Sequence, residues 1–551
     1  MDRIWLQSYP ASTPAEIGPL KDSSLAELME NACRRYDDKA AYLSMGKSLS
    51  YAELDRLSLE YAGWLQSIGI SKGSRVALMM PNLFQYPICL FGALRAGCVV
   101  VNVNPLYTPR ELEHQMKDSG AEVIVVVENF AYTVEQVIPR TALRHVVVTP
   151  MGEMLGGLKG LLVNLVVRHV KKLVPHWHIP GAINLHHALA AGRKHGFKRP
   201  EVGLDDLAFL QYTGGTTGVA KGAMLSHRNI VSNVTQAGAW ISPPVRERQE
   251  LVVTALPLYH IFALTANCLT FLRVGATNLL IANPRDIPGF IKELKGHPFT
   301  VITGVNTLFN ALLNHPDFEG VDFSHLIITL GGGMAVQKPV ADRWQQVTGK
   351  PLIQAYGLTE TSPAATINPL TLTGFNGSIG LPISSTELSI RDDSGQELAV
   401  GQVGEICLRG PQVTKGYWQR ADESATVFYP DGFLRTGDVG YVDEKGFVFL
   451  VDRKKDMILV SGFNVYPNEV EEVVASHPGV REVAAIGVPD AHSGEAVKIF
   501  VVRKDPNLTP EAIIAHCRTQ LTSYKVPHHV EFRDDLPKTN VGKVLRRALK
   551  E

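Results

Sequence analysis

The stretch Tyr212-Thr-Gly-Gly-Thr-Thr-Gly-Val-Ala-Lys-Gly-Ala-Met224 gathers glycine, threonine and lysine in one short segment. In a loop, glycines can adopt backbone angles closed to other residues, so that successive N–H groups turn toward an anion. The threonine hydroxyls add donors, and the lysine adds a mobile positive charge. The stretch therefore predicts a loop that holds a polyphosphate, formed by Thr213, Gly214, Gly215, Thr216, Thr217, Gly218 and Lys221.

The position of the lysine separates this loop from a Walker A loop, in which the lysine directly follows a glycine and the chain runs straight into a helix. Here Lys221 follows Gly218 by three residues, and residues 223–226 precede a helix that Ser226 is expected to cap. An ordinary turn between two strands is the alternative, and the loop alone leaves both interpretations open.

Length and composition describe an ordinary globular protein. With 551 residues the chain is too long for one hydrophobic core, so roughly two to four domains are expected. Its apolar share of 45% and charged share of 20% argue against a disordered or fibrous protein. The 54 basic residues balance 54 acidic ones, so nothing indicates nucleic acid as a partner recognised by bulk charge.

The cysteines and the N-terminus favour a cytoplasmic protein. The six cysteines are widely scattered without a C-x-x-C pair, which argues against a disulfide framework or a zinc site. The first ten residues lack the apolar core of a secretory signal. No apolar run approaches the roughly 18 residues that a membrane-spanning helix needs.

Residues 158–174 add a possible membrane contact. The helical spacing gathers apolar side chains on one face, and these are Leu158, Leu161, Leu162, Leu165, Val166 and Leu173. Lys159, Arg168, Lys171 and Lys172 lie elsewhere on the same helix, and Trp177 follows. This pattern is typical of a basic amphipathic helix on a membrane surface. The alternative is a surface helix that packs on the protein's own core.

The order of expected elements predicts an α/β fold with a mobile C-terminal domain. Apolar strands such as 75–79, 99–102 and 123–127 alternate with helical patterns, and the alternation resumes from residue 207, which favours mostly parallel sheets. After about residue 378, short strands and turns indicate a small antiparallel or barrel-like unit. We expect an N-terminal domain over 1–451, a hinge at 452–455 and a small α+β domain over 456–551.

Four further segments change the weight of the glycine loop. They are Gln354-Ala-Tyr-Gly-Leu-Thr-Glu-Thr361, Phe433-Leu-Arg-Thr-Gly-Asp438, Val451-Asp-Arg-Lys-Lys-Asp456 and Pro537-Lys-Thr-Asn-Val-Gly-Lys543. In this order, the five segments resemble the adenylate-forming superfamily of acyl-CoA ligases, peptide-synthetase adenylation domains and luciferases. Residues 431–471 resemble the signature of fatty-acyl-CoA synthetases, and the likeness is nearest to bacterial long-chain fatty-acid–CoA ligases. One departure is Ala335 in Gly331-Gly-Gly-Met-Ala335, where proline is expected.

The resemblance implies ATP-dependent ligation of a long-chain fatty acid to coenzyme A through an acyl-adenylate, with release of AMP and pyrophosphate. The substrates would be ATP, the fatty acid and coenzyme A, with Mg²⁺ on the phosphates. In this reading Glu360 holds Mg²⁺ with Thr213 as a second ligand. Lys543 bridges the carboxylate and the α-phosphate. Nucleotide contacts are implied for the loop residues together with Gly333, Tyr356, Gly357, Thr359, Asp438 and Arg453.

The same resemblance implies an acyl pocket and a channel for the second substrate. Tyr259, His260, Phe262, Gly331 and Gly332 are expected around the acyl group, with His260 orienting the carboxylate or gating a tunnel. Residues 261–264 and 269–272 could line that tunnel, although apolar stretches usually form core. Rotation of the C-terminal domain about the hinge would bring Gly462 into a pantetheine channel.

Other readings stay open from the sequence. The acid could be a medium-chain or aryl acid, or the enzyme could be an acyl-AMP ligase that acts on a carrier protein. A non-enzymatic nucleotide or lipid sensor is a third class, which the presence of Lys543, Glu360 and Asp438 disfavours. Peripheral contact with the inner face of the membrane and a homodimer are expected as possible partner states.

Overall fold

The computed structural model describes residues 2–213, 220–242, 244–490 and 492–550. A seven-stranded sheet forms the first layer of the fold. Its strands, in spatial order, are β7 (Ile183–Asn184), β6 (His145–Thr149), β5 (Val123–Val127), β3 (Arg75–Met79), β4 (Val99–Val103), β8 (Leu207–Thr213) and β9 (Lys221–Ser226). All neighbours are parallel except β8 and β9. β4 and β5 are buried along their whole length, because helices cover a parallel sheet on both faces.

A nine-stranded mixed sheet forms the second layer. Its order is β16 (Leu381–Pro382), β15 (Ala364–Ile367), β14 (Ile353–Gly357), β13 (Ile328–Gly331), β12 (Val301–Gly304), β10 (Leu251–Thr254), β11 (Thr277–Leu280), β1 (Ala40–Ser44) and β2 (Lys47–Ser50). The run from β14 to β1 is parallel, and β2, β15 and β16 are antiparallel. The expected α/β fold with mostly parallel sheets is therefore confirmed.

Helices between and outside these two sheets enclose the main cores. The helices are α1 (Leu25–Arg35), α2 (Tyr51–Ser67), α3 (Gln85–Arg95), α4 (Pro109–Ser119), α5 (Ala131–Val137), α7 (Leu185–His195), α8 (His227–Ile241), α9 (Ile287–Lys295), α10 (Asn306–Leu313) and α11 (Lys338–Thr348). The largest core joins α1, α2, α3 and α8 to both sheets. The Ser226 side chain accepts a hydrogen bond from the backbone of Asn229, so α8 begins with the cap that the sequence predicts.

The unit after residue 378 is a four-stranded antiparallel sheet. Its strands are β17 (Glu387–Arg391), β18 (Gly404–Arg409), β19 (Leu434–Val442) and β20 (Val448–Arg453), with the short helix α12 (Ala421–Thr426) beside it. The strands pair in a row with β17 and β20 at the edges, so the antiparallel form of the prediction holds and the barrel form does not.

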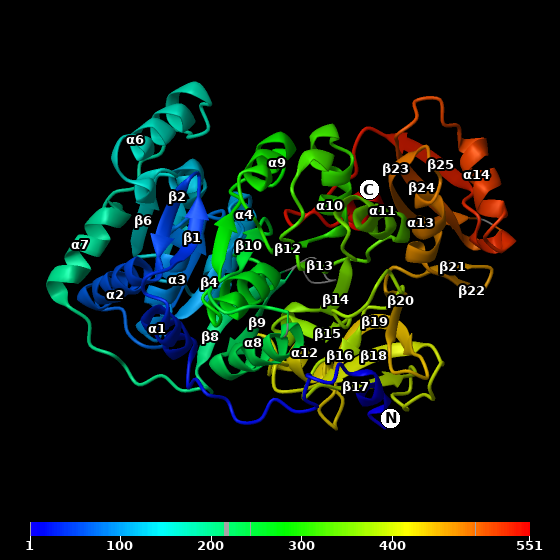
Figure 1. Cartoon of the computed structure of the whole chain (residues 1–551), viewed down its shortest axis with the longest axis horizontal. Coiled ribbons are helices and arrows are strands. Elements are labelled where there is room, and N and C mark those ends of the chain that lie inside the picture. Colours follow the sequence, from blue (N-terminus) through cyan, green and yellow to red (C-terminus); the bar gives the residue numbers. More distant parts are fainter. Residues whose placement is uncertain (1, 214–219, 243, 491, 551) are drawn as a thin grey trace.

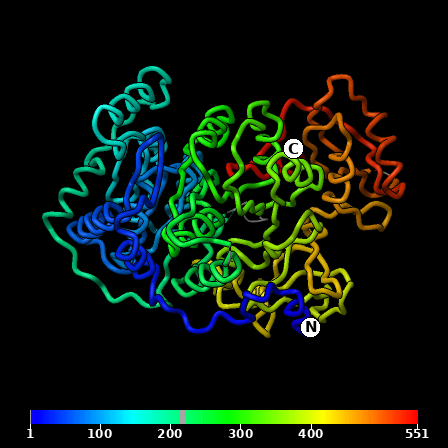
Figure 2. The backbone as a smooth tube through the Cα atoms, in the orientation of Figure 1, coloured from blue at the N-terminus to red at the C-terminus, as the bar shows by residue number. Residues whose placement is uncertain are grey.

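The C-terminal unit has a sheet and a core of its own. Its elements are β21 (Ile458–Val460), β22 (Phe463–Val465), α13 (Pro467–Ala475), β23 (Val480–Asp490), β24 (Gly494–Arg503), α14 (Pro510–Arg518) and β25 (His529–Arg533). Strand pairing changes from one sheet to the next between Arg453 and Ile458. The unit lies at one end of the molecule (Figure 1), and its last residues run back into the middle (Figure 2).

A helical arm projects at the opposite end of the molecule (Figure 1). It consists of α6 (Gly157–Leu165) and a π-helical turn over Val166–Val170. Among the described residues, no helix combines the length and the apolar content that crossing a membrane requires. All six cysteines are buried and unpaired.

Candidate active site

A cavity of about 2300 Å³ lies where the nine-stranded sheet, the four-stranded sheet and the C-terminal segment meet. It exceeds the roughly 300–1,000 Å³ of an ordinary small-molecule pocket, so it has room for more than one substrate. Most of the sequence-predicted residues line it. These are Thr213, Lys221, Tyr259, His260, Phe262, Gly332, Gly333, Tyr356, Gly357, Thr359, Glu360, Asp438, Arg453 and Lys543.

Seven of the expected site residues do not appear in this lining. Gly214, Gly215, Thr216, Thr217 and Gly218 lie outside the described residues, so the centre of the glycine loop stays a prediction. Gly331 belongs to β13, where an added Cβ would lie 2.9 Å from Val336, and this places it in the core beside the cavity. Gly462 lies in the exposed turn between β21 and β22.

Three polar residues form the wall of the cavity at the four-stranded sheet. Tyr356, in β14, donates a hydrogen bond of 2.7 Å to the Asp438 carboxylate on β19. The Arg453 guanidinium, at the end of β20, lies 3.2 Å from the other Asp438 oxygen. Burial raises the pKa of Asp438, and Arg453 opposes that shift. A ligand whose hydroxyl groups took the place of the Tyr356 hydroxyl could donate hydrogen bonds to the Asp438 carboxylate, which the Arg453 guanidinium already holds in position.

Lys543 enters the same cavity from the other end of the chain. A turn at Gly542, with φ of +84°, is closed by a hydrogen bond from the Thr539 backbone to the Lys543 carbonyl. A Cβ added at Gly333 would lie 3.4 Å from Lys543 Cε, so the lysine passes over a glycine surface. Burial, aided by Arg453, lowers the pKa of Lys543 to about 8. An anion bound beside this ammonium would favour the charged form and raise the pKa of Lys543 again.

The C-terminal segment is held in this position by α10. Thr307 donates a hydrogen bond of 2.8 Å to the Gly542 carbonyl, and Asn310 donates one of 3.0 Å to the Arg481 carbonyl. Gly542 also approaches closely, because an added Cβ would lie 2.9 Å from the Thr307 hydroxyl. The structure therefore shows Lys543 docked against the N-terminal part of the chain.

Glu360 and Lys221 share a polar network at the end of the cavity next to the glycine loop. Tyr417 donates a hydrogen bond of 2.7 Å to one Glu360 oxygen. The Lys221 ammonium lies 5.6 Å above the Tyr417 ring and is paired with Glu423 on α12. Lys221 and Thr213 face each other in the pairing of β9 with β8, so both lie at the two ends of the glycine loop.

His260 lines the cavity near enough to Lys543 for the lysine charge to act on it. Burial, with the Lys543 charge as the lesser cause, lowers the pKa of His260 to about 3, so the imidazole is neutral at physiological pH. The His260 Nδ1 accepts a hydrogen bond of 3.3 Å from the Phe262 backbone. An added Cβ at Gly332 would lie 3.2 Å from the Phe262 ring, so this glycine lets the aromatic ring approach. A neutral imidazole can donate to an acyl carboxylate without adding charge.

One part of the cavity wall is apolar. Six of its side chains belong to one packed cluster, and these are Ile241, Phe271, Val301, Ile328, Leu330 and Leu370. They come from α8, the π-helix over Ala263–Thr270 and its end, β12, β13 and the loop after β15. Leu264, Leu269 and Leu272, which could have lined a tunnel, are buried in the main core instead. Ile261, Phe262, Thr270 and Phe271 from the same two stretches do line the cavity, and other elements supply the rest of the apolar wall.

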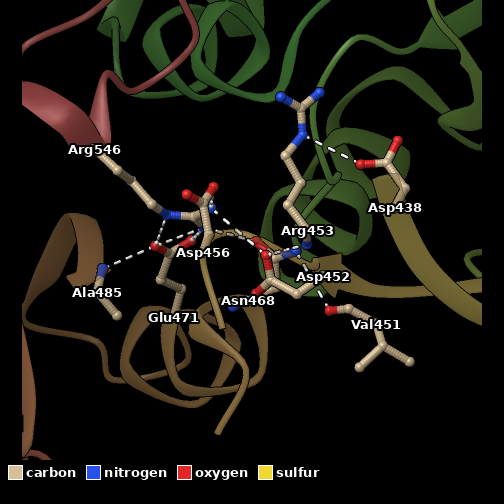
Figure 3. A network of polar contacts seen from close by, with 9 residues as sticks. All are labelled: Asp438, Val451, Asp452, Arg453, Asp456, Asn468, Glu471, Ala485 and Arg546. Atoms are coloured by element: carbon tan, nitrogen blue, oxygen red, sulfur yellow. Dashed lines mark hydrogen bonds and ion pairs between the residues drawn. The ribbon is translucent and has the colours of Figure 1, made fainter. Parts of the chain in front are cut away.

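At the expected hinge, the side chains of two successive residues contact different parts of the chain (Figure 3). Asp452 accepts a hydrogen bond of 2.8 Å from the Asn468 backbone of α13 and lies 3.7 Å from Arg546. Arg546 in turn contacts both oxygens of Glu471 at 2.9 Å. Arg453, the next residue, pairs with Asp438 in β19. The domain bounds stay a prediction, but the residues at 452 and 453 contact different units.

Sequence reasoning missed Tyr417, Glu423 and Thr307. Tyr417 lies in the aromatic pair that follows Lys415-Gly416, and Glu423 lies in the first turn of a short helix. Nothing in their spacing relates them to Glu360 or Lys221, because their contacts join segments far apart in sequence. Thr307 carries no signal of its own, since threonine near the start of a helix usually serves that helix.

Comparison with known proteins agrees with this geometry. The family model described as "AMP-binding enzyme" matches residues 29–418, and the one described as "AMP-binding enzyme C-terminal domain" matches residues 469–543. A long-chain-fatty-acid–CoA ligase from Escherichia coli O157:H7 is 58% identical, over 100% of this chain and 98% of its own length.

The solved structures also bear on the arrangement of the two parts. ATP-bound MatB from Rhodopseudomonas palustris is 29% identical and covers 95% of this chain and 98% of its own, with a TM-score of 0.82. The apo form of the same protein has the same identity and coverage with a TM-score of 0.73. The present arrangement is therefore more similar to the ATP-bound form of that relative than to its apo form.

Proposed function

The chain belongs to the AMP-binding enzyme family, and on that premise we propose that it joins a long-chain fatty acid to coenzyme A. In the first half-reaction the carboxylate attacks the α-phosphorus of ATP, giving an acyl-adenylate and pyrophosphate. In the second, the thiol of coenzyme A attacks the acyl carbonyl, AMP leaves, and a thioester forms. The single observation that carries the proposal is one cavity in which Lys543, Asp438 and Glu360 meet an extended apolar wall.

In the first half-reaction, Lys543 would bridge two anions. Its buried ammonium would contact the acyl carboxylate and the α-phosphate as charge develops between them. Asp438 and Arg453 would hold the ribose, and the Tyr356 ring would face the adenine. Gly333, Gly357 and Thr359 complete the nucleotide wall. Residues 213–218 and Lys221 would hold the β- and γ-phosphates, for which Lys221 must leave Glu423.

The residues at the phosphate end fit a magnesium ion. Glu360 lines the cavity, and Tyr417 fixes one of its oxygens. No cluster of three or more histidine, cysteine or carboxylate side chains in the described residues could hold a metal alone. Mg²⁺ suits such a site, because it commonly takes one or two protein oxygens and completes its shell with phosphates and water. When bound, it would neutralise phosphate charge, with Glu360 and the Thr213 hydroxyl as its protein ligands.

The acyl group would lie between His260 and the apolar wall. His260, Tyr259 and Phe262 line the cavity, and Gly332 gives the space for the ring of Phe262. Each methylene buried against the apolar side chains contributes roughly 0.8 kcal/mol, so a long chain gains more than a short one. A polar acid of the same length would lose this contribution.

The second half-reaction needs a rotation of the C-terminal unit. Lys543 would occupy the approach to an acyl carbonyl bound in the cavity, whereas Gly462 is not among the residues that line the cavity. We propose that residues 452–455 act as the hinge and that rotation moves the turn at Gly462 to the cavity as part of the pantetheine channel. The opposite contacts of Asp452 and Arg453 support a joint at this point.

The proposal also covers the location of the enzyme and its oligomeric state. We propose a cytoplasmic enzyme that touches the inner face of the membrane, where long-chain fatty acids partition; the absence of a spanning helix in the described residues leaves a surface contact as the mode. A homodimer remains a prediction without an assigned surface.

The substrate class is tested by pyrophosphate release with palmitate, octanoate, benzoate and amino acids, each with and without coenzyme A. We expect palmitate to be activated best and to give acyl-CoA only when coenzyme A is present. Turnover of benzoate without turnover of palmitate would overturn the long-chain assignment. Full-rate transfer to a carrier protein with no transfer to coenzyme A would favour the acyl-AMP ligase instead.

A further inference from the structure

The projecting arm, α6 with its π-helical turn, packs with its small and polar face inward. Gly160, Asn164 and Val167 recur at helical spacing on the side that meets the body of the protein. Gly160 and Val167 are buried, and Asn164 is half-buried. The leucines lie on the other side. The leucine face therefore does not pack on the protein's own core, which was the alternative interpretation of this segment, although Val163 of the same helix packs beside the main core.

Polar and backbone contacts fix this orientation. An added Cβ at Gly160 would lie 2.4 Å from the Gly152 carbonyl oxygen, so a larger residue could not sit there. The Gly152 backbone donates a hydrogen bond of 2.7 Å to the Asn164 side chain. Arg168 contacts the buried Glu128 through bonds of 2.6–3.1 Å. The arm is thus attached without the help of its leucines.

The outward face is the densest exposed apolar surface among the described residues. Of thirteen exposed large apolar residues, six belong to this arm and the residues that follow it. Their exposed fractions are 86% for Leu158, 69% for Leu161, 62% for Leu162, 53% for Leu165, 68% for Val170 and 53% for Leu173. Surface leucines normally occur singly, whereas a contiguous group marks a site of interaction.

The charged side chains of the same region are all basic. The chain as a whole is neutral, yet no aspartate or glutamate occurs between Glu153 and Glu201. Lys171 and Lys172 are exposed at the end of the arm, and the described residues give neither of them an ion-pair partner. An apolar face bordered by free cations complements a surface that is apolar inside and anionic outside.

We propose that this arm docks on an anionic phospholipid bilayer. The leucines would enter the boundary between headgroups and acyl chains, and Lys171 and Lys172 would lie among the phosphates. An open apolar recess of about 800 Å³ beside the arm, lined by Leu158, Leu161 and Trp177, adds to the surface that lipid would cover. The docking gives the proposed membrane contact its location, and it rests on the proposed function only for its purpose, the uptake of long-chain acids.

Flotation of the full chain with vesicles tests the docking. Wild-type protein should float with vesicles of phosphatidylcholine and phosphatidylglycerol, and less with phosphatidylcholine alone. The L161D/L165D variant should lose binding by at least about tenfold, because both leucines leave the lipid boundary. The matched variant L59D/V403D changes two exposed apolar residues outside the arm and should float like wild type. Equal flotation of wild type and L161D/L165D would overturn the proposal.

The charge component has its own variant. K171E/K172E should lower binding to the anionic vesicles by about fivefold for each lysine, with little change on neutral vesicles. Binding that ignores lipid charge in both proteins would overturn the proposed headgroup contact. A wild type that does not float, but sediments as a dimer that L161D/L165D converts to monomer, would assign the face to a second copy and overturn the bilayer.

Activity in solution separates this inference from the proposed function. Without vesicles, wild type and L161D/L165D should activate octanoate at the same rate, because the arm lies outside the cavity. If wild type floats but activates no fatty acid, the proposed function fails and the docking stands. If octanoate is activated equally and neither protein floats, the docking fails and the proposed function stands.

Discussion

Two glycine turns of the C-terminal unit have the same backbone angle and opposite surroundings. Gly542 and Gly462 each have φ of +84°. Gly542 is packed against Thr307 and directs Lys543 into the cavity, whereas nothing lies within 4 Å of a Cβ added at Gly462. One turn is therefore engaged and the other is exposed. Under the proposed mechanism the unit has two working faces, and this arrangement is the one for adenylation.

The largest effect is expected when the C-terminal unit loses the positive charge that it directs into the cavity. K543A should slow acyl-adenylate formation by about 10³-fold, because the group proposed to bridge the two anions is gone. Thioester formation from preformed acyl-adenylate should be largely kept. Single-turnover assays of the two half-reactions measure this, with K504A, an exposed lysine of the same unit, as the control. An equal loss in both half-reactions would contradict the division of labour.

The converse change is made on the exposed face. G462L should slow thioester formation by about 100-fold and leave adenylation unchanged, since a side chain would obstruct the proposed channel only after rotation. G401L is the matched control, because Gly401 has φ of +83° and also has nothing near its added Cβ. If both variants lost thioester formation alike, backbone strain and not the channel would explain the result.

The pH dependence should distinguish the two faces next. The pKa of Lys543 is lowered to about 8, and the protonated ammonium is the form that binds anions. Its fraction falls with rising pH above that value, so kcat/KM for adenylation should fall by about tenfold per unit. The K543R variant should lack this decline. Thioester formation from acyl-adenylate should not show it, and a decline in both half-reactions would argue against Lys543 as its source.

The smallest effect is expected at the docking contacts. T307V and N310A each remove one hydrogen bond to the C-terminal unit, worth roughly 1 kcal/mol, so adenylation should fall by about fivefold. Thioester formation should stay the same or rise, because the rotated state is relatively favoured. T519V, which removes a hydrogen bond inside the unit, is the control. A fall in both half-reactions for T307V would mean that Thr307 serves folding instead.

Whether a site residue could be predicted from the sequence depends on whether a sequence motif or only a tertiary contact identifies it. Lys543, Asp438 and Glu360 line the cavity as expected, because each lies in a recognisable segment. The partners Tyr417 and Glu423 were missed, since their contacts join distant segments. Gly331 was expected to line the acyl pocket, but it is the last residue of the strand β13 and packs against Val336.

The arm is a second example of what the sequence pattern alone does not predict. The periodicity of residues 158–174 predicts a helix with a leucine face, and that face exists. Periodicity does not say which face meets the protein. Here the contact of Gly152 with Gly160 decides it, and this depends on the fold of both segments.

The pairing of Asp452 and Arg453 with different units has a thermodynamic consequence. Side chains of successive strand residues point to opposite faces, so one short segment attaches to α13 on one side and to Asp438 on the other. If rotation changes the position of Arg453, the affinity for a nucleotide held by Asp438 must differ between the two arrangements. By reciprocity, a bound nucleotide must then shift the rotational equilibrium by the same factor. The segment at Asp452 and Arg453 would in that case respond to nucleotide binding in the cavity as well as permit rotation of the C-terminal unit.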